Sequence, residues 1–161
     1  SEWRKIEHKP SKVDFPRKYV LAYFLGKPDK EQQRYIQKMA KMKNCEILEL
    51  NNVNIPTLYN CGPKEFLYLI DHAECIFTDS FHGTVFSILF QKQFKVFERN
   101  GLKNSMSSRI DSLFDMLELE NSGCRYISER NEIVLPNYES VLCILQKEKD
   151  RSVEYLASVL K

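Results

Sequence analysis

The chain lacks several features that would place it in a class at once. Its 161 residues hold 24 Lys and Arg against 22 Asp and Glu, so it has no excess of positive charge of the kind found in nucleic-acid-binding proteins. Its longest unbroken apolar run, residues 19–25, is far shorter than the about 20 residues that a membrane-spanning helix needs. The first twenty residues contain no apolar segment of signal-peptide length. We therefore expect no transmembrane segment, no secretion signal and no nucleic-acid partner.

Cysteine and histidine patterns typical of disulfides or metal sites are also absent. The five cysteines are an odd number, none forms a CxxC pair, and the three histidines show no zinc-type spacing with them. This pattern indicates reduced thiols in a cytoplasmic protein with no metal site. A chain of this length, 43% hydrophobic and 29% charged, can bury about two-thirds of its unfolded surface, so one self-sufficient domain is expected.

Strand and helix signals alternate along most of the chain. Residues 1–18 are polar, basic and interrupted by prolines, and we interpret them as a linker or N-terminal extension to a domain over residues 19–161. Residues 19–25 are apolar on both faces, which is typical of an inner strand of a parallel sheet. Further strands are expected at residues 46–50, 74–78 and 94–97, with amphipathic helices between and after them and a loop at 51–62. This order predicts an α/β fold, a Rossmann-like parallel sheet with helices on both faces.

Ligands of such sheets bind beyond the carboxyl ends of the strands. One candidate loop, containing Lys27, follows the first strand, and a second follows the third strand as Asp79, Ser80, Phe81, His82 and Gly83. The second loop runs directly into a helix, so its backbone N–H groups and the helix dipole favour an anion there. Gly83 would let a ligand approach the backbone, and His82 would place a proton donor or acceptor beside the anion. The same residues also suit a helix cap with a surface histidine, so spacing alone leaves both interpretations open.

Two arginines lie near the same edge of the predicted sheet. Arg99 follows the strand at 94–97, and Arg109 lies in the first turn of a helix that Ser107 and Ser108 open. An arginine at this end of a helix gains nothing from the dipole. It therefore needs either a carboxylate partner, which Asp111 could supply, or an anionic ligand.

These residues carry a resemblance to a known family. The stretch GPKEFLYLIDHAECIFTDSFHGTVFSILFQKQFKVFER at residues 62–99 resembles the signature region of the polysaccharide pyruvyl transferases. The likeness extends over about residues 19–161, through NSMSSRIDSLFDMLELE at 104–120 and RSVEYLASVL at 151–160, with TDSFHG and SSRI as its most specific parts. Members of this family resemble the glycosyltransferase B architecture, two Rossmann-like lobes around a cleft. The resemblance implies that this chain is the C-terminal lobe, that the N-terminal lobe is missing, and that the lobe alone is inactive.

The resemblance also implies an activity and a set of site residues. The family transfers a pyruvyl group from phosphoenolpyruvate to a hydroxyl of a cell-surface polysaccharide such as an exopolysaccharide, usually closing a ketal, and it uses no cofactor. The family's motif histidine falls on His82. Several members have an arginine two residues earlier, where this chain has Ser80, so the backbone amides of residues 81–83, or Arg99 and Arg109, would hold the donor instead. Lys27 is a further candidate donor-binding residue, and Asp79 a supporting one.

Two other functions are compatible with the sequence. The chain could be the donor-binding lobe of a nucleotide-sugar glycosyltransferase, whose diphosphate would occupy the same helix start. It could also be a degenerate, non-catalytic scaffold domain. The presence of the motif residues His82 and Gly83 disfavours this interpretation, whereas Ser80 in place of the arginine of several members favours it.

Overall fold

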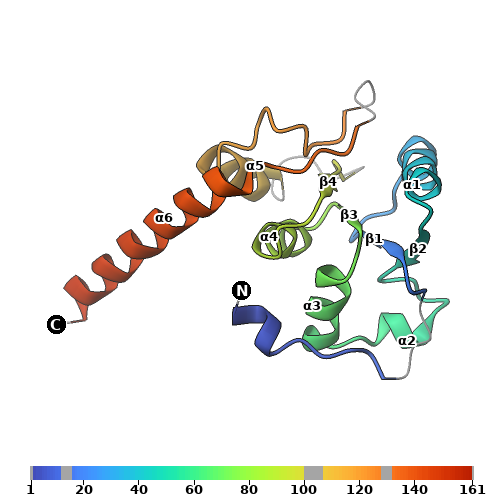
Figure 1. The fold of residues 1–161 in the computed structure, drawn as a ribbon, viewed down its shortest axis with the longest axis horizontal. Helices are drawn as coiled ribbons and strands as arrows, with labels where there is room; N and C mark the ends of the chain where they lie inside the picture. Colours follow the sequence, from blue (N-terminus) through green and yellow to red (C-terminus); the bar gives the residue numbers. More distant parts are fainter. Residues whose placement is uncertain (1, 12–15, 100–106, 128–131, 161) are drawn as a thin grey trace.

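Four short parallel strands form the central sheet, in the order β2-β1-β3-β4 (Figure 1). The computed structural model describes residues 2–11, 16–99, 107–127 and 132–160. The strands are β1 Tyr19–Tyr23, β2 Glu46–Glu49, β3 Cys75–Thr78 and β4 Phe94–Val96. In register, Val20 lies opposite Ile47 on one side and Cys75 on the other. The α/β fold and its Rossmann-like parallel sheet are therefore confirmed.

Helices cover both faces of this sheet. The helices are α1 Lys30–Met42, α2 Pro56–Tyr59, α3 Pro63–Asp71, α4 Phe81–Leu89, α5 Ser107–Met116 and α6 Tyr138–Val159, with a 3-10 helix η1 at Glu2–Lys5. Side chains alternate along β1: Tyr19 and Leu21 join the core under α3 and α4, and Val20 joins the core under α1. A strand that is apolar on both faces is therefore buried on both faces, as the sequence predicts.

A capping box fixes the start of α1, the first crossover helix. The side chain of Asp29 accepts hydrogen bonds from the backbone N–H groups of Glu31 and Gln32, each at 2.8 Å. The Gln32 side chain accepts in return from the Asp29 N–H at 3.0 Å, which completes a capping box. This cap fixes where the loop after β1 ends and α1 starts.

One segment differs from the sequence-based expectation: residues 51–62, expected as a loop, include the short helix α2. The N-terminal segment packs onto the domain, because Trp3 contacts the Phe86 ring edge-on at 5.3 Å between centroids and Arg4 pairs with Asp71. The C-terminal apolar stripe forms a single helix, α6, which extends away from the rest of the domain, and all its residues from Arg151 on are exposed (Figure 1).

The strand order creates a switch point between β1 and β3. From β1 the chain crosses through α1 to β2 on one side, and from β2 it returns through α3 to β3 on the other. The connections after β1 and after β3 therefore leave the sheet in opposite directions, and α/β proteins bind their ligands at such a switch point.

Candidate functional site

The candidate site lies at the carboxyl edge of the sheet, where the loops after β1, β3 and β4 meet. Asp79, the residue after β3, holds these loops together although its side chain is only 2% exposed. Its carboxylate accepts hydrogen bonds from the Leu25 N–H at 2.7 Å, the Gly26 N–H at 2.8 Å and the Arg99 Nε–H at 2.9 Å. One buried carboxylate thus joins three loops at the switch point.

Arg99, predicted to bind the donor, is engaged by this carboxylate. Besides its bond to the Asp79 side chain, Arg99 donates from a terminal nitrogen to the Asp79 backbone oxygen at 3.2 Å. Its side chain is 14% exposed. Most of its charge is therefore matched inside the protein, and Arg99 positions the loops.

Close packing determines the start of α4. The Thr78 hydroxyl donates to the Tyr23 carbonyl at 2.6 Å and accepts from the Ser80 N–H at 3.0 Å, so it joins the ends of β1 and β3. Ser80 is fully buried, and its side-chain oxygen accepts from the Gly83 N–H at 3.4 Å as the N-cap of α4. A Cβ on Gly83 would lie 2.5 Å from the Thr78 hydroxyl oxygen. Because Gly83 has no side chain, its backbone can pack directly against Thr78 at the end of β3. From the sequence, we expected the same absence to let a ligand approach the backbone.

The outer side of the same helix turn carries the groups that face solvent. His82 is exposed, and its ring lies edge-on to that of Phe81 with 6.0 Å between centroids. Among the described residues, the backbone N–H groups of Phe81 and His82 have no hydrogen-bond partner, because the Ser80 cap uses the N–H of Gly83. An imidazole and two unengaged N–H donors therefore share one exposed turn.

Arg109 reaches this turn from α5. Its guanidinium lies 5.2 Å from the centroid of the Phe81 ring, a cation–π contact. Asp111, considered above as its carboxylate partner, accepts instead from Arg125 at 2.6 Å. The structure therefore brings Arg109 to the exposed turn that carries His82.

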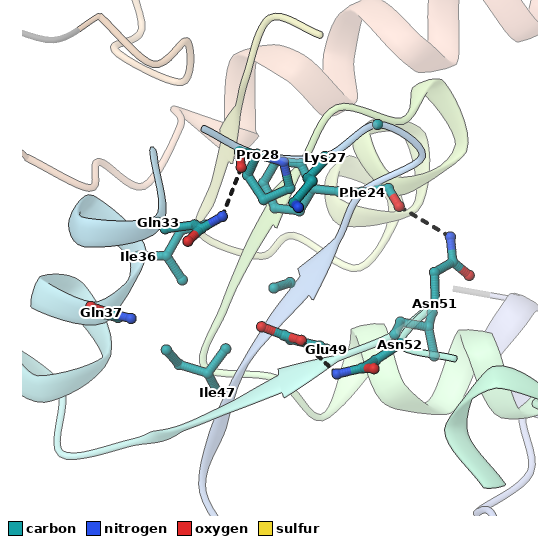
Figure 2. Close-up of a pocket in the computed structure, with 13 residues that line it drawn as sticks. Phe24, Lys27, Pro28, Gln33, Ile36, Gln37, Ile47, Glu49, Asn51 and Asn52 are labelled. Atoms are coloured by element: carbon teal, nitrogen blue, oxygen red, sulfur yellow. Dashed lines mark hydrogen bonds between the residues drawn. The ribbon is translucent and has the colours of Figure 1, made fainter. Parts of the chain in front are cut away.

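Lys27 lies on the other side of the Asp79 contacts. With Gly26, it lines a hollow of about 340 Å³ between α1 and the ends of β1 and β2 (Figure 2). The sequence analysis missed this hollow, because its polar residues at 49–52 belong to a segment that shows only strand and loop signals. The predicted residues thus separate into a turn with Phe81, His82 and Arg109, a clamp of Asp79 and Arg99, and Lys27 in a neighbouring hollow.

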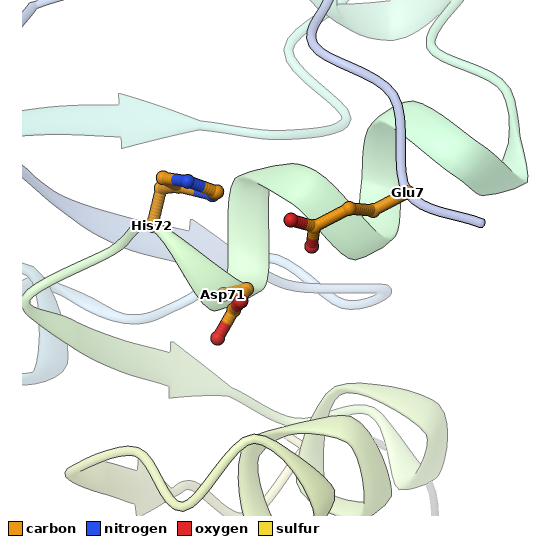
Figure 3. Close-up of side chains that lie close together, drawn as sticks. All are labelled: Glu7, Asp71 and His72. Carbon is orange, nitrogen blue, oxygen red and sulfur yellow. The ribbon is translucent and has the colours of Figure 1, made fainter. Parts of the chain in front are cut away.

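A second cluster of polar side chains lies away from this edge. Glu7, Asp71 and His72 have ligand-type atoms within 4.8 Å of one another at the end of α3 (Figure 3). Both Asp71 oxygens are engaged, because Arg4 donates to them at 2.7 and 2.8 Å. The pKa of Glu7 is raised, mainly by burial and further by the Asp71 charge. Asp71 is already neutralised by Arg4, and the raised pKa of Glu7 disfavours its charged form. These two carboxylates are therefore poor ligands for a cation.

The arrangement at the α4 turn suits one kind of chemistry. Two free N–H groups, the positive end of the helix dipole and a nearby guanidinium attract an anion. An exposed imidazole next to them can give or accept a proton. Comparison with known proteins names the class: a model of the family described as "Polysaccharide pyruvyl transferase" matches residues 1–101.

The chain belongs to the polysaccharide pyruvyl transferase family. The match includes the N-terminal segment and the loops that carry Lys27, Asp79, His82 and Arg99. Residues 104–120 and 151–160, which also contribute to the resemblance, lie beyond it. No curated protein and no solved structure matches the chain.

Family membership indicates a transferase of polysaccharide synthesis whose acceptor is a saccharide. Within the part of the chain that the structure describes, every helix is too short or too polar to cross a membrane.

Proposed function

We propose that this chain is the donor-binding lobe of a cytoplasmic enzyme that transfers a pyruvyl group from phosphoenolpyruvate to a saccharide and closes a ketal. Its family supports transfer to a saccharide, and the site supports an anionic donor. The observation that carries the proposal is the exposed His82 imidazole on a helix turn with two unengaged N–H groups. A second Rossmann-like lobe would close the cleft over this edge, as in the glycosyltransferase B architecture.

The donor's chemistry matches these groups. Phosphoenolpyruvate carries a phosphate and a carboxylate, so it needs donors for two anionic groups. In the proposed arrangement one group lies against the N–H groups of Phe81 and His82, and the other faces the Arg109 guanidinium, which the Phe81 ring holds nearby. Arg99 and Asp79 keep the loops in place beneath them, and no cofactor takes part.

His82 handles the proton in this scheme. The methylene carbon of phosphoenolpyruvate accepts a proton from the protonated imidazole, and a sugar hydroxyl forms a C–O bond to the adjacent carbon while its own proton returns to the imidazole. The C–O bond to phosphate then breaks, a second sugar hydroxyl attacks the same carbon, and its proton leaves with the phosphate. The products are a cyclic ketal and inorganic phosphate.

Replacing His82 tests this role. In the intact enzyme, we expect His82→Asn to lower kcat by about 100-fold or more, the usual size of a lost general acid, with a smaller change in KM for phosphoenolpyruvate. Phosphate release in the presence of a saccharide acceptor measures both constants. His72→Asn is the matched control, because His72 is also exposed but lies at the end of α3. Turnover of His82→Asn near that of the control would exclude the proposed proton transfer.

A further inference from the structure

The hollow beside the switch point is not used by the donor chemistry. It lies on the α1 side of the sheet, over the ends of β1 and β2, and its volume of about 340 Å³ is at the small end of the range for ligand pockets. Its floor is apolar, formed by Ala22 and Ile47 from adjacent strands and by Ile36 from α1. Figure 2 shows polar side chains around this floor, from α1 on one side and from the residues after β2 on the other.

The polar rim offers both hydrogen-bond acceptors and donors. Gln33 donates one side-chain N–H to the Pro28 carbonyl at 2.8 Å, and Asn51 donates one to the Phe24 carbonyl at 3.2 Å. Each of these amides therefore keeps its oxygen and its second N–H for a ligand.

Glu49 adds further acceptor capacity at the end of β2. One of its carboxylate oxygens accepts from the Asn52 amide at 2.8 Å, and the residue is exposed at the rim. With Glu49 and Lys27 both lining it, the hollow carries one charge of each sign, so it gives an anion little net attraction and suits a neutral ligand that brings hydroxyl groups. The side chains of Lys27 and Gln37 add further donors at the rim.

We propose that this hollow binds a sugar ring of the acceptor saccharide. A pyranose ring has hydroxyl donors for the acceptors of the rim and C–H groups for the apolar floor. The hollow also adjoins the donor site, because Gly26 lines it and donates its N–H to Asp79 at 2.8 Å, three residues before His82. The identification of the ring as the acceptor rests on the proposed function.

Titration of the ¹⁵N-labelled chain tests the hollow directly. The probes are D-galactose and D-mannose in one arm, adenosine and uridine in a second, and phosphoenolpyruvate in a third. We expect the neutral sugars to shift the amide signals of Gln37, Asn51 and Asn52. Glu49→Gln should weaken this binding about tenfold, because a hydrogen bond to a charged group is lost. Glu46→Gln is the matched control, since Glu46 is exposed on the same strand but does not line the hollow.

Each outcome decides a different point. Shifts that Glu49→Gln weakens and Glu46→Gln does not would support the inference. No shift with either sugar up to its solubility limit, or equal effects of the two variants, would overturn it. Tighter binding of the nucleosides than of the sugars would also overturn it and would favour a nucleotide-sugar enzyme. The phosphoenolpyruvate arm is read at Phe81 and His82, so a failure of the donor proposal appears there while the sugar arm still reports on the hollow.

Discussion

Removal of the Asp79 side chain tests whether its carboxylate stabilises the loops after β1, β3 and β4 at the carboxyl edge of the sheet. In Asp79→Ala, the Arg99 guanidinium loses its buried counter-charge, and the N–H groups of Leu25 and Gly26 lose their acceptor. Breaking a buried ion pair from one side costs about 3–5 kcal/mol. Arg99 is 14% exposed and keeps its bond to the Asp79 backbone oxygen, so we expect about 3 kcal/mol.

Thermal and urea unfolding measure this change. For a chain of this size, each kcal/mol lowers Tm by about 2–4 °C, so a fall of about 6–12 °C is expected. The matched control is Glu74→Ala, which removes an exposed carboxylate at the opposite end of β3 and should stay within about 0.5 kcal/mol of wild type. A double-mutant cycle with Arg99→Ala should give a coupling energy of about 1 kcal/mol or more.

Two results would contradict the role proposed for the Asp79 carboxylate. If Asp79→Ala unfolds with the same free energy as the Glu74→Ala control, the carboxylate does not stabilise the three loops. If the double-mutant cycle shows no coupling, the contact between Asp79 and Arg99 is energetically irrelevant, and Arg99 is available to the donor.

Two further substitutions probe the packing of α4 and the N-terminal segment. Gly83→Ala should destabilise the protein by about 1–2 kcal/mol in urea unfolding, because its Cβ would meet the Thr78 hydroxyl oxygen at 2.5 Å; unchanged or higher stability would contradict this packing. Glu7→Gln should stabilise the protein at pH 7 by about 0.5–1 kcal/mol, since one Glu7 oxygen is buried with no partner among the described residues and the pKa of Glu7 is raised, mainly by burial. Because the folded protein binds the Glu7 proton more tightly than the unfolded chain does, this advantage should shrink as pH falls through the raised pKa and should be lost at pH 4; an advantage that persists there would refute the electrostatic cause.

Local sequence signals predicted the elements of the fold. The apolar run at residues 19–25 and the capping box of Asp29 and Gln32 each depend on neighbours within a few positions, so the sequence alone reveals them. The four-residue helix α2 is too short to show a period, and the sequence analysis missed it. The partner of Trp3 could not be identified, because Phe86 lies far along the chain.

The sequence indicated which loops meet at the carboxyl edge of the sheet, but not how their side chains pair. Parallel strands bring their carboxyl ends to one edge, and this rule alone indicated the loops at Lys27, Asp79 and Arg99. The sequence could not show that Asp79 would engage Arg99, because two residues 20 positions apart give no pairing signal. For the same reason, it gave no indication that Gly83 is needed for contact with Thr78.

The central position of β1 has a consequence for how this lobe assembles. Within this lobe, β1 precedes both of the strands that flank it, since the residues of β2 and β3 follow it by more than twenty and more than fifty positions. Until both arrive, the nascent chain carries an apolar segment with two unsatisfied hydrogen-bonding edges, a state that invites mispairing with other chains. Sheet growth then proceeds outward from this strand in both directions. Substitutions in β1 should therefore affect yield during synthesis more severely than equally buried substitutions in β4, which joins last.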